Sequence, residues 1–384
     1  MPSEPGPTIA ATDSTPALLR VRSVHRAIAD LRRGTPVVLL GAAPIVVLPA
    51  ETAGARGLSE LAGLAAAPAC LLLAPVRAAA LLRRPIAPAG PIVAFRTAGL
   101  LEPALLRGMA DPTAEQLLLD PPDLTTVPPL ALAAIAAAKL ARLLPAVLAV
   151  PVSTAAGRGA AERAAALGLL AVEADDVMAY PDASAASLQP VATASVPLAA
   201  TADARIVAFR AADAGIEHLA IVVGDPAHRS PDAPAPLVRL HSECFTGDLL
   251  GSLRCDCGPQ LQVALDRIAA DGTGVLLYLA QEGRGIGLVN KLRAYGLQDR
   301  GLDTVDANRA LGWQADERNF MVAATMLEQL GLHRIRLLTN NPDKIAALAA
   351  CGIDVERREE LIIPANGIND HYLATKTRRF GHLL

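Results

Sequence analysis

The sequence predicts an α/β protein of two domains, each a mixed sheet with packed helices. The chain has 384 residues, more than one domain usually holds. Hydrophobic residues make up 52% and charged residues 19%, a composition typical of globular proteins with large cores. Short apolar runs alternate with helical patterns, as in mixed α/β layer folds. We expect the domains to cover residues 1–194 and 195–384.

The first half begins with an amphipathic helix that Gly34 ends. Its apolar face consists of Val24, Ala27, Ile28 and Leu31. The remaining patterns predict strands at 37–40, 45–48, 70–74, 92–95, 146–150 and 171–173, and helices at 130–143 and 159–167. Asp175 and Asp176 form the one adjacent carboxylate pair of this half, and we interpret them as a helix N-cap.

Residues 181–190 are small and polar, and we interpret them as the linker between the domains. The second half then predicts strands at 204–209, 219–223, 237–241, 275–279 and 335–338. Helices are expected from Pro259 to Gly272, from Leu288 through Leu292 and Tyr295, from Asp316 to Gly331, and after Pro342. Between them, residues 298–313 form a polar loop long enough to be functional.

Composition and charge argue against several classes of protein. A net charge of −3 disfavours nucleic-acid binding by bulk electrostatics, so a polyanion would need a local basic cluster. Residues 129–152 could be mistaken for a membrane span, but Lys139, Arg142 and Pro145 interrupt them, and no continuous apolar run approaches the ~20 residues that a span requires. Five cysteines without an apolar leader predict a cytoplasmic protein, and residues 1–15 predict a loose tail.

Residues 241–257 carry three of the five cysteines, Cys244, Cys255 and Cys257. The one-residue gap between the last two gives poor geometry for a disulfide. Three thiolates suit Zn²⁺, and three protein ligands leave one position open for water, as in catalytic zinc sites. The spacing also allows two alternatives. His241 could complete a closed structural site, or the cysteines could be buried apolar residues.

Two junctions between a strand and a helix are suited to phosphate. Residues 281–288 form a Gly-rich turn that contains Arg284, a forked donor for phosphate oxygens. A tight turn with a solvated arginine is the alternative interpretation. The second junction, residues 339–342, offers hydroxyl and amide groups and is followed by Lys344.

The remaining polar residues of this half allow simple interpretations. Asp316 is expected to cap a helix, and Tyr295 to lie at the edge of a core. Arg318 in a first helical turn opposes the helix dipole, which indicates an anion nearby.

Together these motifs resemble the GTP cyclohydrolase II family, whose members open the imidazole ring of GTP in the first step of riboflavin synthesis. The resemblance covers residues 195–384. It rests on RLHSEC at 239–244, LRCDCG at 253–258, QEGR at 281–284, LQD at 297–299, DER at 316–318 and LTNNP at 338–342.

The resemblance implies the following roles. Cys244, Cys255 and Cys257 would hold zinc, whose water attacks C8 of guanine. GTP would be bound by Arg239, Leu240, His241, Ser242, Glu243, Gln260, Glu282, Gly283, Arg284, Thr304, Thr339 and Lys344. Asp316 would accept a proton, Tyr295 would orient the water or the base, and Arg318 would be a nucleophile or stabilise the α-phosphate. The very high pKa of arginine favours stabilisation. Mg²⁺ at the phosphates and a homodimer are also expected.

The first half resembles 3,4-dihydroxy-2-butanone-4-phosphate synthase. The resemblance rests on AIADLRRG at 27–34, MADP at 109–112, LGL at 167–169 and DDVMAY at 175–180. The family's acidic Mg²⁺ loop is replaced by GAAP at 41–44, and its Arg-x-Gly-His-Thr segment by TTVPP at 125–129. Alanine cannot hold Mg²⁺, so we expect an inactive domain that serves packing, dimerisation or regulation.

Three alternatives remain open from the sequence. The chain could be bifunctional and also make 3,4-dihydroxy-2-butanone 4-phosphate. It could instead be a non-catalytic GTP-binding protein with structural zinc. It could also be a variant enzyme that opens the ring and keeps the triphosphate.

Overall fold

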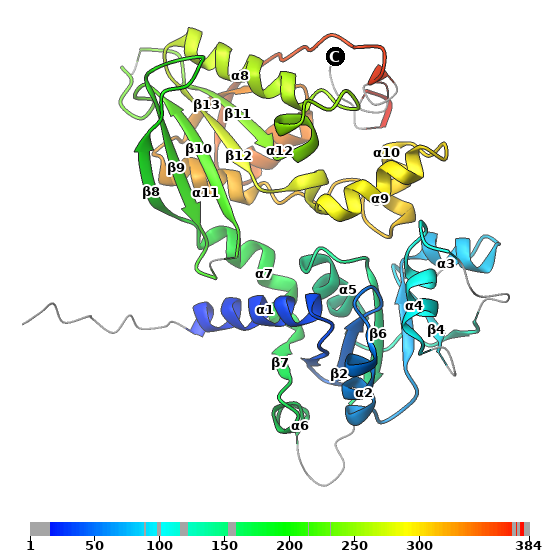
Figure 1. Ribbon diagram of the computed structural model, residues 1–384. Helices are drawn as coiled ribbons and strands as arrows, with labels where there is room; N and C mark the ends of the chain where they lie inside the picture. The colour runs from blue at the N-terminus through cyan, green and yellow to red at the C-terminus, as the bar shows by residue number, and fades with distance from the viewer. Residues whose placement is uncertain are drawn as a thin grey trace, which may run out of the picture.

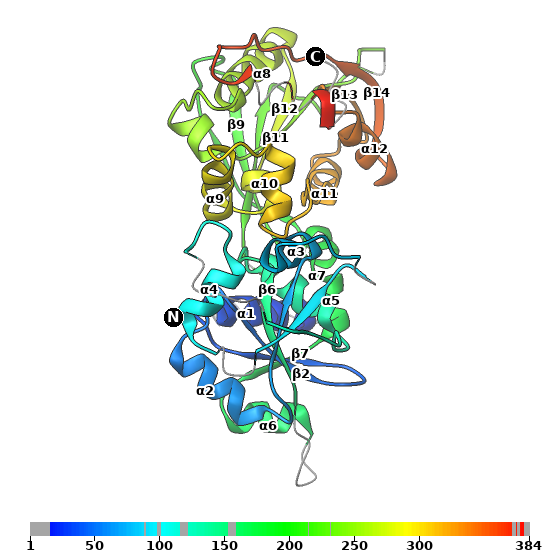
Figure 2. The same ribbon diagram turned by 90° about the vertical axis from the view of Figure 1, so that its right-hand side faces the viewer.

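A computed structural model of the chain contains two seven-stranded mixed sheets with packed helices, as the sequence predicts (Figures 1 and 2). It describes residues 16–87, 90–97, 101–115, 122–152, 159–213, 215–230, 232–370, 374 and 377–379. The expected tail at residues 1–15 lies outside these ranges, as does part of residues 366–382, for which the sequence predicts a turn and a polar helix. Within them, no helix has the length and apolar character needed to cross a membrane.

The first sheet has the strand order β5-β4-β3-β6-β2-β1-β7. Its strands are β1 (Val37–Leu40), β2 (Ile45–Pro49), β3 (Cys70–Leu73), β4 (Val93–Arg96), β5 (Leu124–Thr125), β6 (Ala146–Pro151) and β7 (Leu170–Glu173). The helices of this half are α1 (Pro16–Arg32), α2 (Ala55–Leu64), α3 (Pro75–Leu82), α4 (Pro103–Ala110), α5 (Ala131–Leu140), α6 (Ala160–Ala166) and α7 (Ala174–Ala186). All neighbouring strands are antiparallel except β1 and β7.

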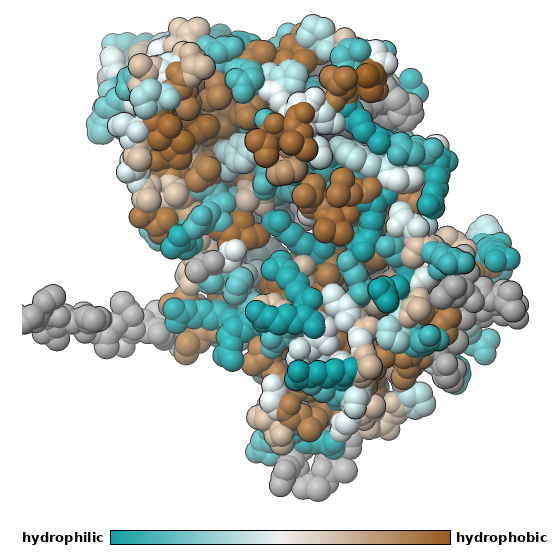
Figure 3. All heavy atoms as spheres, viewed as in Figure 1, coloured by the Kyte–Doolittle hydropathy of each residue, from teal (hydrophilic) through white to brown (hydrophobic). Residues whose placement is uncertain are grey.

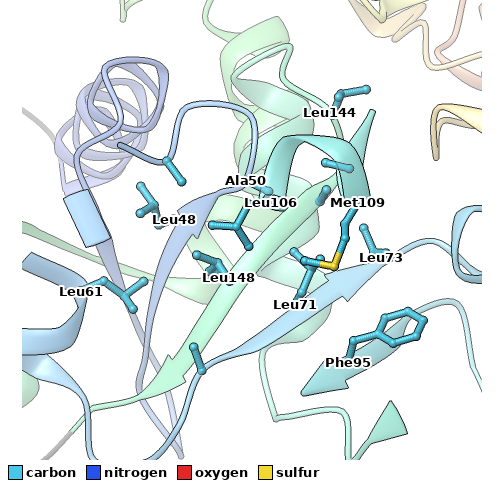
Figure 4. Packing of buried hydrophobic residues seen from close by; sticks show 14 of the residues in the cluster. Leu48, Ala50, Leu61, Leu71, Leu73, Phe95, Leu106, Met109, Leu144 and Leu148 are labelled. Carbon is cyan, nitrogen blue, oxygen red and sulfur yellow. The ribbon is translucent and has the colours of Figure 1, made fainter. Parts of the chain in front are cut away.

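Both faces of the first sheet are buried, which explains why its strands are continuous apolar runs. Leu71 and Leu73 point to one core, and Leu72 between them points to the other. Figure 4 shows the first of these cores, where Leu71, Leu148 and Phe95 pack from neighbouring strands. Helices α1, α5 and α7 supply much of the core on the opposite face.

The second sheet has the order β14-β13-β11-β12-β10-β9-β8. Its strands are β8 (Gln189–Ser195), β9 (Ala204–Arg210), β10 (Glu217–Val223), β11 (Leu237–Ser242), β12 (Gly274–Leu279), β13 (Arg334–Leu338) and β14 (Asp354–Glu359). Its helices are α8 (Cys257–Asp271), α9 (Leu288–Gln298), α10 (Thr304–Ala310), α11 (Met321–Gln329) and α12 (Pro342–Ala350), with short turns η2 (Phe245–Leu249) and η3 (Glu282–Gly285). Strands β12, β11, β13 and β14 run parallel to one another.

The region between the sheets differs from the expected linker. Helix α7 continues through Pro181 to Ala186, and the second sheet already begins at Gln189, before the expected boundary after residue 194. The helix also starts earlier than expected. Its N-cap residue is Glu173, so Asp175 and Asp176 lie in the first turn, where carboxylates favour the helix dipole.

Several boundaries in the second half also differ from the sequence prediction. The expected loop at 298–313 contains α10, whose first turn is capped by the Asp303 carboxylate. Asp316 caps no helix, because α11 begins only at Met321. Pro259 is the third residue of α8, which begins at Cys257. The spacing of Leu288, Leu292 and Tyr295 predicts one apolar face of α9, but Leu292 is 51% exposed.

Candidate active site

The candidate site lies where the parallel strands of the second sheet end. The carboxyl ends of β11, β12 and β13 meet at one edge, the usual position of ligands on such sheets. Three segments follow these ends and converge there, namely 243–249, 281–287 and 339–341. A pocket at this edge is lined by Arg239, His241, Ser242, Glu243, Cys244, Arg254, Cys255, Cys257, Gln260, Glu282, Gly283, Arg284, Ile286, Lys291, Ala294, Tyr295, Gln298, Thr304, Asn308, Arg318, Thr339, Asn340, Asn341, Lys344 and Leu361.

The three cysteines converge at one wall of this pocket. Their sulfur atoms all lie within 4.8 Å of one another, and the Sγ atoms of Cys244 and Cys255 are 3.7 Å apart. Two sulfurs bound tetrahedrally to one zinc at about 2.3 Å lie about 3.8 Å apart, so the spacing fits this ion. Gly247 makes room for the cluster, since a Cβ there would lie 2.9 Å from two of the sulfurs. The residues present can therefore hold a metal ion.

The cysteines share their protons. Hydrogen bonds from Cys255 and Cys257, followed by the charge of Lys291, lower the pKa of Cys244. The same sharing, mainly with Cys244, raises the pKa of Cys255 to about 11. One sulfur is thus a ready thiolate, while the others lose their protons when a metal binds.

His241 does not complete a closed metal site. Its Nε2 lies 3.0 Å from the Asp248 carboxylate, and its ring stacks on Tyr278, whose hydroxyl donates to the same carboxylate. Asp248 also accepts a hydrogen bond from the backbone N–H of Cys244, so this network holds the start of the cysteine segment. Among the described residues, the group that could hold a metal ion consists of Cys244, Cys255 and Cys257. All three cysteines line the pocket.

Lys291 and Glu282 form a buried ion pair behind the cysteines. The Lys291 Nζ lies 2.9 Å from Glu282 and 3.1 Å from the sulfur of Cys244. The other oxygen of Glu282 accepts the backbone N–H of Phe245, which ties the turn after β12 to the cysteine segment. The sequence interpretation missed Lys291, although it precedes Tyr295 by one helical turn and therefore lies on the same side of α9.

A basic cluster forms another wall of the pocket. Arg239 is almost fully buried, donates to the Leu338 carbonyl and to Gln260, and has its pKa lowered to about 10 by burial. It therefore stays charged at neutral pH. Lys344, on α12, donates to the Leu240 carbonyl at 2.8 Å. Their charges attract an anion, as we expected for the junction after β13.

Asp316 and Arg318 lie in the loop before α11. The guanidinium group of Arg318 forks onto the Asp316 carboxylate, lies 3.4 Å from the Ser242 hydroxyl, and stacks on Phe320. Burial opposes the charge of Asp316, but the hydrogen bonds and charge of Arg318 prevail and lower the pKa of Asp316. The carboxylate is ionised at neutral pH and accepts hydrogen bonds from Arg318, whose side chain lines the pocket.

Tyr295 and Thr304 border the pocket on the side of α9 and α10. The hydroxyl of Tyr295 lies 3.5 Å from Thr246, and the guanidinium group of Arg254 stacks on its ring at 4.5 Å. Burial raises the pKa of Tyr295, so this side chain is a neutral hydroxyl. Thr304 is the first residue of α10 and receives a hydrogen bond from Gln298.

Most of the residues expected at the site line this pocket, with two exceptions. The side chain of Leu240 is buried in the core, and only its carbonyl reaches Lys344. Asp316 reaches the pocket through Arg318. Lining residues that the sequence did not assign a role in the site are Arg254, Ile286, Lys291, Ala294, Gln298 and Leu361. Arg254 and Gln298 belong to motifs singled out in the sequence, Asn340 and Asn341 supply the amides of the junction expected to suit phosphate, and Asn308 lies in the polar loop expected to be functional.

Comparisons with known proteins agree with this geometry. A GTP cyclohydrolase II family model matches residues 189–360. A GTP cyclohydrolase-2 from Azospirillum brasilense is 47% identical over 398 residues, which cover 100% of this chain and 98% of the relative. GTP cyclohydrolase-2 proteins from Shigella boydii and Yersinia pestis are 51% and 53% identical over 197 residues, 51% of this chain and 98% of their own length.

Solved structures were also compared. A two-domain 3,4-dihydroxy-2-butanone 4-phosphate synthase from A. baumannii aligns with 89% of this chain and 99% of its own, at 18% identity and a TM-score of 0.33. The corresponding synthase from Candida albicans aligns with 41% of this chain and 96% of its own, at 17% identity and a TM-score of 0.34. The match to the Azospirillum relative over its whole length decides the assignment. This chain belongs to the GTP cyclohydrolase II family.

Proposed function

We propose that the protein hydrolyses GTP to 2,5-diamino-6-(5-phosphoribosylamino)pyrimidin-4(3H)-one, formate and pyrophosphate, the first step of riboflavin biosynthesis. One observation carries this proposal. Three sulfurs spaced for a single zinc ion open onto the same pocket as Arg239, Arg318 and Lys344. The pocket therefore pairs a site for hydrolysis with cations for a triphosphate.

The cysteine cluster would hold one zinc ion. When bound, zinc lowers the pKa of a coordinated water to about 7 and so supplies a nucleophile at neutral pH. The chain supplies the thiolates, the space at Gly247 and the ammonium group of Lys291 against Cys244. That ammonium group offsets part of the negative charge of three thiolates, which a divalent ion alone leaves at −1.

The basic residues would bind the phosphates of GTP. Arg239, Arg318 and Lys344 reach the pocket from β11, from the loop before α11, and from α12. Arginine forks match phosphate oxygens in pairs, and Lys344 adds a point charge. Mg²⁺ would accompany the phosphates, because a triphosphate carries more charge than bound side chains usually neutralise. Gln260, Thr304 and the remaining lining residues expected from the resemblance would complete the GTP site.

Three side chains would act on the reacting groups. Asp316 is an ionised carboxylate, able to accept a proton, although its lowered pKa makes it a weak base. Arg318 would stabilise the α-phosphate, since its pKa is too high for ready nucleophilic attack. Tyr295, a neutral hydroxyl beside the cluster, would orient the water or the base.

The first half would be an inactive relative of 3,4-dihydroxy-2-butanone-4-phosphate synthase. Residues 41–44 offer no carboxylate for a metal ion. We keep the division into a domain at 1–194 and a cyclohydrolase domain at 195–384 as a proposal, with residues 189–194 contributed to the second sheet. We also propose a cytoplasmic location, since free cysteines are typical of a reducing compartment.

A second copy of the chain would cover an apolar patch beside the pocket. The patch consists of Leu249, Leu250, Leu253, Val289 and Leu292, each more than half exposed. Leu249 ends η2, Leu250 and Leu253 lie between η2 and α8, and Val289 and Leu292 lie on α9. Figure 3 shows exposed apolar surface on the second half of the chain. Such exposed apolar groups are typical of protein interfaces. Sedimentation analysis should show a homodimer, and a monomer at micromolar concentration would contradict it.

Product analysis tests the proposed reaction and its alternatives. Incubation of the zinc-loaded protein with GTP and Mg²⁺ should release formate and pyrophosphate in equal amounts. Formate without pyrophosphate would instead indicate an enzyme that keeps the triphosphate. Release of neither would leave a GTP-binding zinc protein. With ribulose 5-phosphate and Mg²⁺, no 3,4-dihydroxy-2-butanone 4-phosphate should form; its formation would show that the first half is active.

A further inference from the structure

The 314–318 loop, which carries Asp316 and Arg318, forms an ion pair with the first half of the chain. The ammonium group of Lys139, on α5, lies 2.5 Å from Oε1 of Glu317. Both side chains are about four-fifths buried, with 21% and 20% exposure, so the pair is shielded from solvent. Glu317 stands between Asp316 and Arg318, the two residues proposed to act on the substrate. Lys139 therefore holds the residue at the centre of this loop.

Glu317 also contacts two other parts of the site. Its carboxylate also accepts the backbone N–H of Gln314, which closes the loop on itself. Its own N–H donates to the carbonyl of Arg284 at 3.0 Å. A Cβ at Gly285 would lie only 2.8 Å from the Glu317 carbonyl, so the two segments are in close contact. The position of Glu317 thus sets the spacing between the 314–318 loop and the Gly-rich turn.

Arg142 fixes the same Gly-rich turn from the other side. Its guanidinium group donates to the carbonyl of Ala280 at 2.9 Å, just before the turn. Its own carbonyl accepts the Asn290 amide at 3.0 Å, just after the turn. Its side chain packs against Gly287, where a Cβ would lie 3.1 Å from it. Both ends of the turn are therefore attached to the first half.

Apolar packing joins the two halves around these polar contacts. Ile286, Ala294, Leu297, Leu311 and Trp313 of the second half belong to the same buried core as the strands of the first sheet. Figures 1 and 2 show α9 and α10 between the second sheet and the first half. This segment also supplies Lys291, Tyr295 and Thr304 to the pocket. One wall of the pocket is thus built on the first half.

We propose that Lys139 is a positioning residue for the GTP site, and that the first half serves the reaction as a brace for the loop that carries Asp316 and Arg318. The inference rests on the proposed function. The Shigella and Yersinia relatives align almost fully with half of this chain, so they have no counterpart of the brace. We therefore expect its loss to slow the reaction without abolishing it.

The test compares full-length variants of one ion pair. Lys139→Met and Glu317→Gln should each lower kcat for formate release about fivefold to tenfold, with zinc content unchanged. Because both variants remove the same ion pair, the double variant should lose no more than either single variant. Lys139→Arg, which keeps the cation, should recover at least half of the wild-type kcat. Trp313 is the only tryptophan and lies 5.5 Å from Lys139, so its emission should change in Lys139→Met but not in Lys139→Arg.

Arg293→Gln is the matched control. Arg293 joins the same two halves through Glu51 and Asp111 and donates to Asn290, and none of these partners belongs to the 314–318 loop. It should lower the melting temperature while kcat stays within twofold. If the wild type is active and Lys139→Met has the same kcat, the inference is wrong. It is also wrong if the losses of kcat in the two single variants multiply in the double variant. If the wild type releases no formate, the proposed function is wrong. The positioning role of Lys139 is then tested by the GTP affinities measured by calorimetry. Equal affinities of the wild type and Lys139→Met would rule out that role.

Discussion

Replacement of Gly247 by alanine tests the metal site through its geometry. The backbone of Gly247 lies outside the left-handed region, so alanine meets no conformational barrier there. An added Cβ would lie 2.9 Å from the sulfurs of Cys244 and Cys255 and from the Cβ of Cys257. Ordinary contacts begin at 3.4 Å, so each neighbour must retreat by about 0.5 Å.

That displacement exceeds what zinc tolerates. Metal–ligand distances in functional sites stay within about 0.2 Å of their preferred values. Cysteine side chains can rotate away from the new methyl group, but their sulfurs then leave the tetrahedral positions. Changes that only disturb the surroundings of ligands cost about tenfold to a hundredfold in metal affinity. We expect Gly247→Ala to lose at least as much, and formate release to fall with it.

The assay measures zinc content after dialysis against a competing chelator, together with formate release. Gly296→Ala is the matched control, because it lies in α9 near the site and a Cβ there meets nothing within 4 Å. In a helix this change should stabilise the protein by about 0.5–1 kcal/mol and leave zinc binding intact. Wild-type zinc affinity and turnover in Gly247→Ala would refute the view that these sulfurs form one metal site.

Three further predictions concern buried charges. Lys291→Met leaves Glu282 buried without its cation and should lower the free energy of unfolding by about 3 kcal/mol in urea titrations; an unchanged midpoint would contradict this. Burial, and to a smaller extent the charge of Arg142, lowers the pKa of His218 from 6.5 to about 4. Between these two values the unfolded chain binds the proton more readily than the folded protein does. The free energy of unfolding therefore falls as the pH drops from 6.5 to 4. Protonation of His218 should lower the free energy of unfolding by about 2 kcal/mol between about pH 7 and pH 5. In His218→Gln, whose amide oxygen can still accept the Ala280 N–H, the decrease should be smaller by that amount. Equal pH profiles of wild type and variant would contradict this prediction. Asp316→Asn should keep its zinc while formate release falls about 10²- to 10⁴-fold, and a rate near wild type would exclude proton transfer by this carboxylate.

The sequence predicted most strands of both sheets because their signals are local, but not β5, which has two residues, or β14, which is largely polar and partly exposed. Runs such as 70–73 and 275–279 are apolar throughout, as strands buried on both faces must be. The cysteine spacing and the two phosphate-suited junctions likewise lie within short segments, and the structure brings them to one sheet edge. Parallel pairing of β11 with β12 and β13 explains why three such segments meet.

What the sequence missed depends on contacts between distant segments. Lys291 is buried because Glu282 and Cys244 surround it, and no pattern within α9 indicates this. Leu292 is exposed because α9 turns Ala294 and Leu297 toward the first half. Asp316 was expected to cap a helix, but its carboxylate accepts Arg318 and the helix begins later. The contact between Lys139 and Glu317 joins residues 178 positions apart.

The central claim is that one sulfur-bound metal ion and one nucleotide pocket act together. Cys255→Ser tests it most directly, with zinc content and GTP-dependent formate release measured on the same preparation as the wild type. We predict about one zinc per wild-type chain, and loss of both the metal and formate release in the variant, which should remain folded by circular dichroism. A zinc-free Cys255→Ser protein that still releases formate at the wild-type rate would contradict the account.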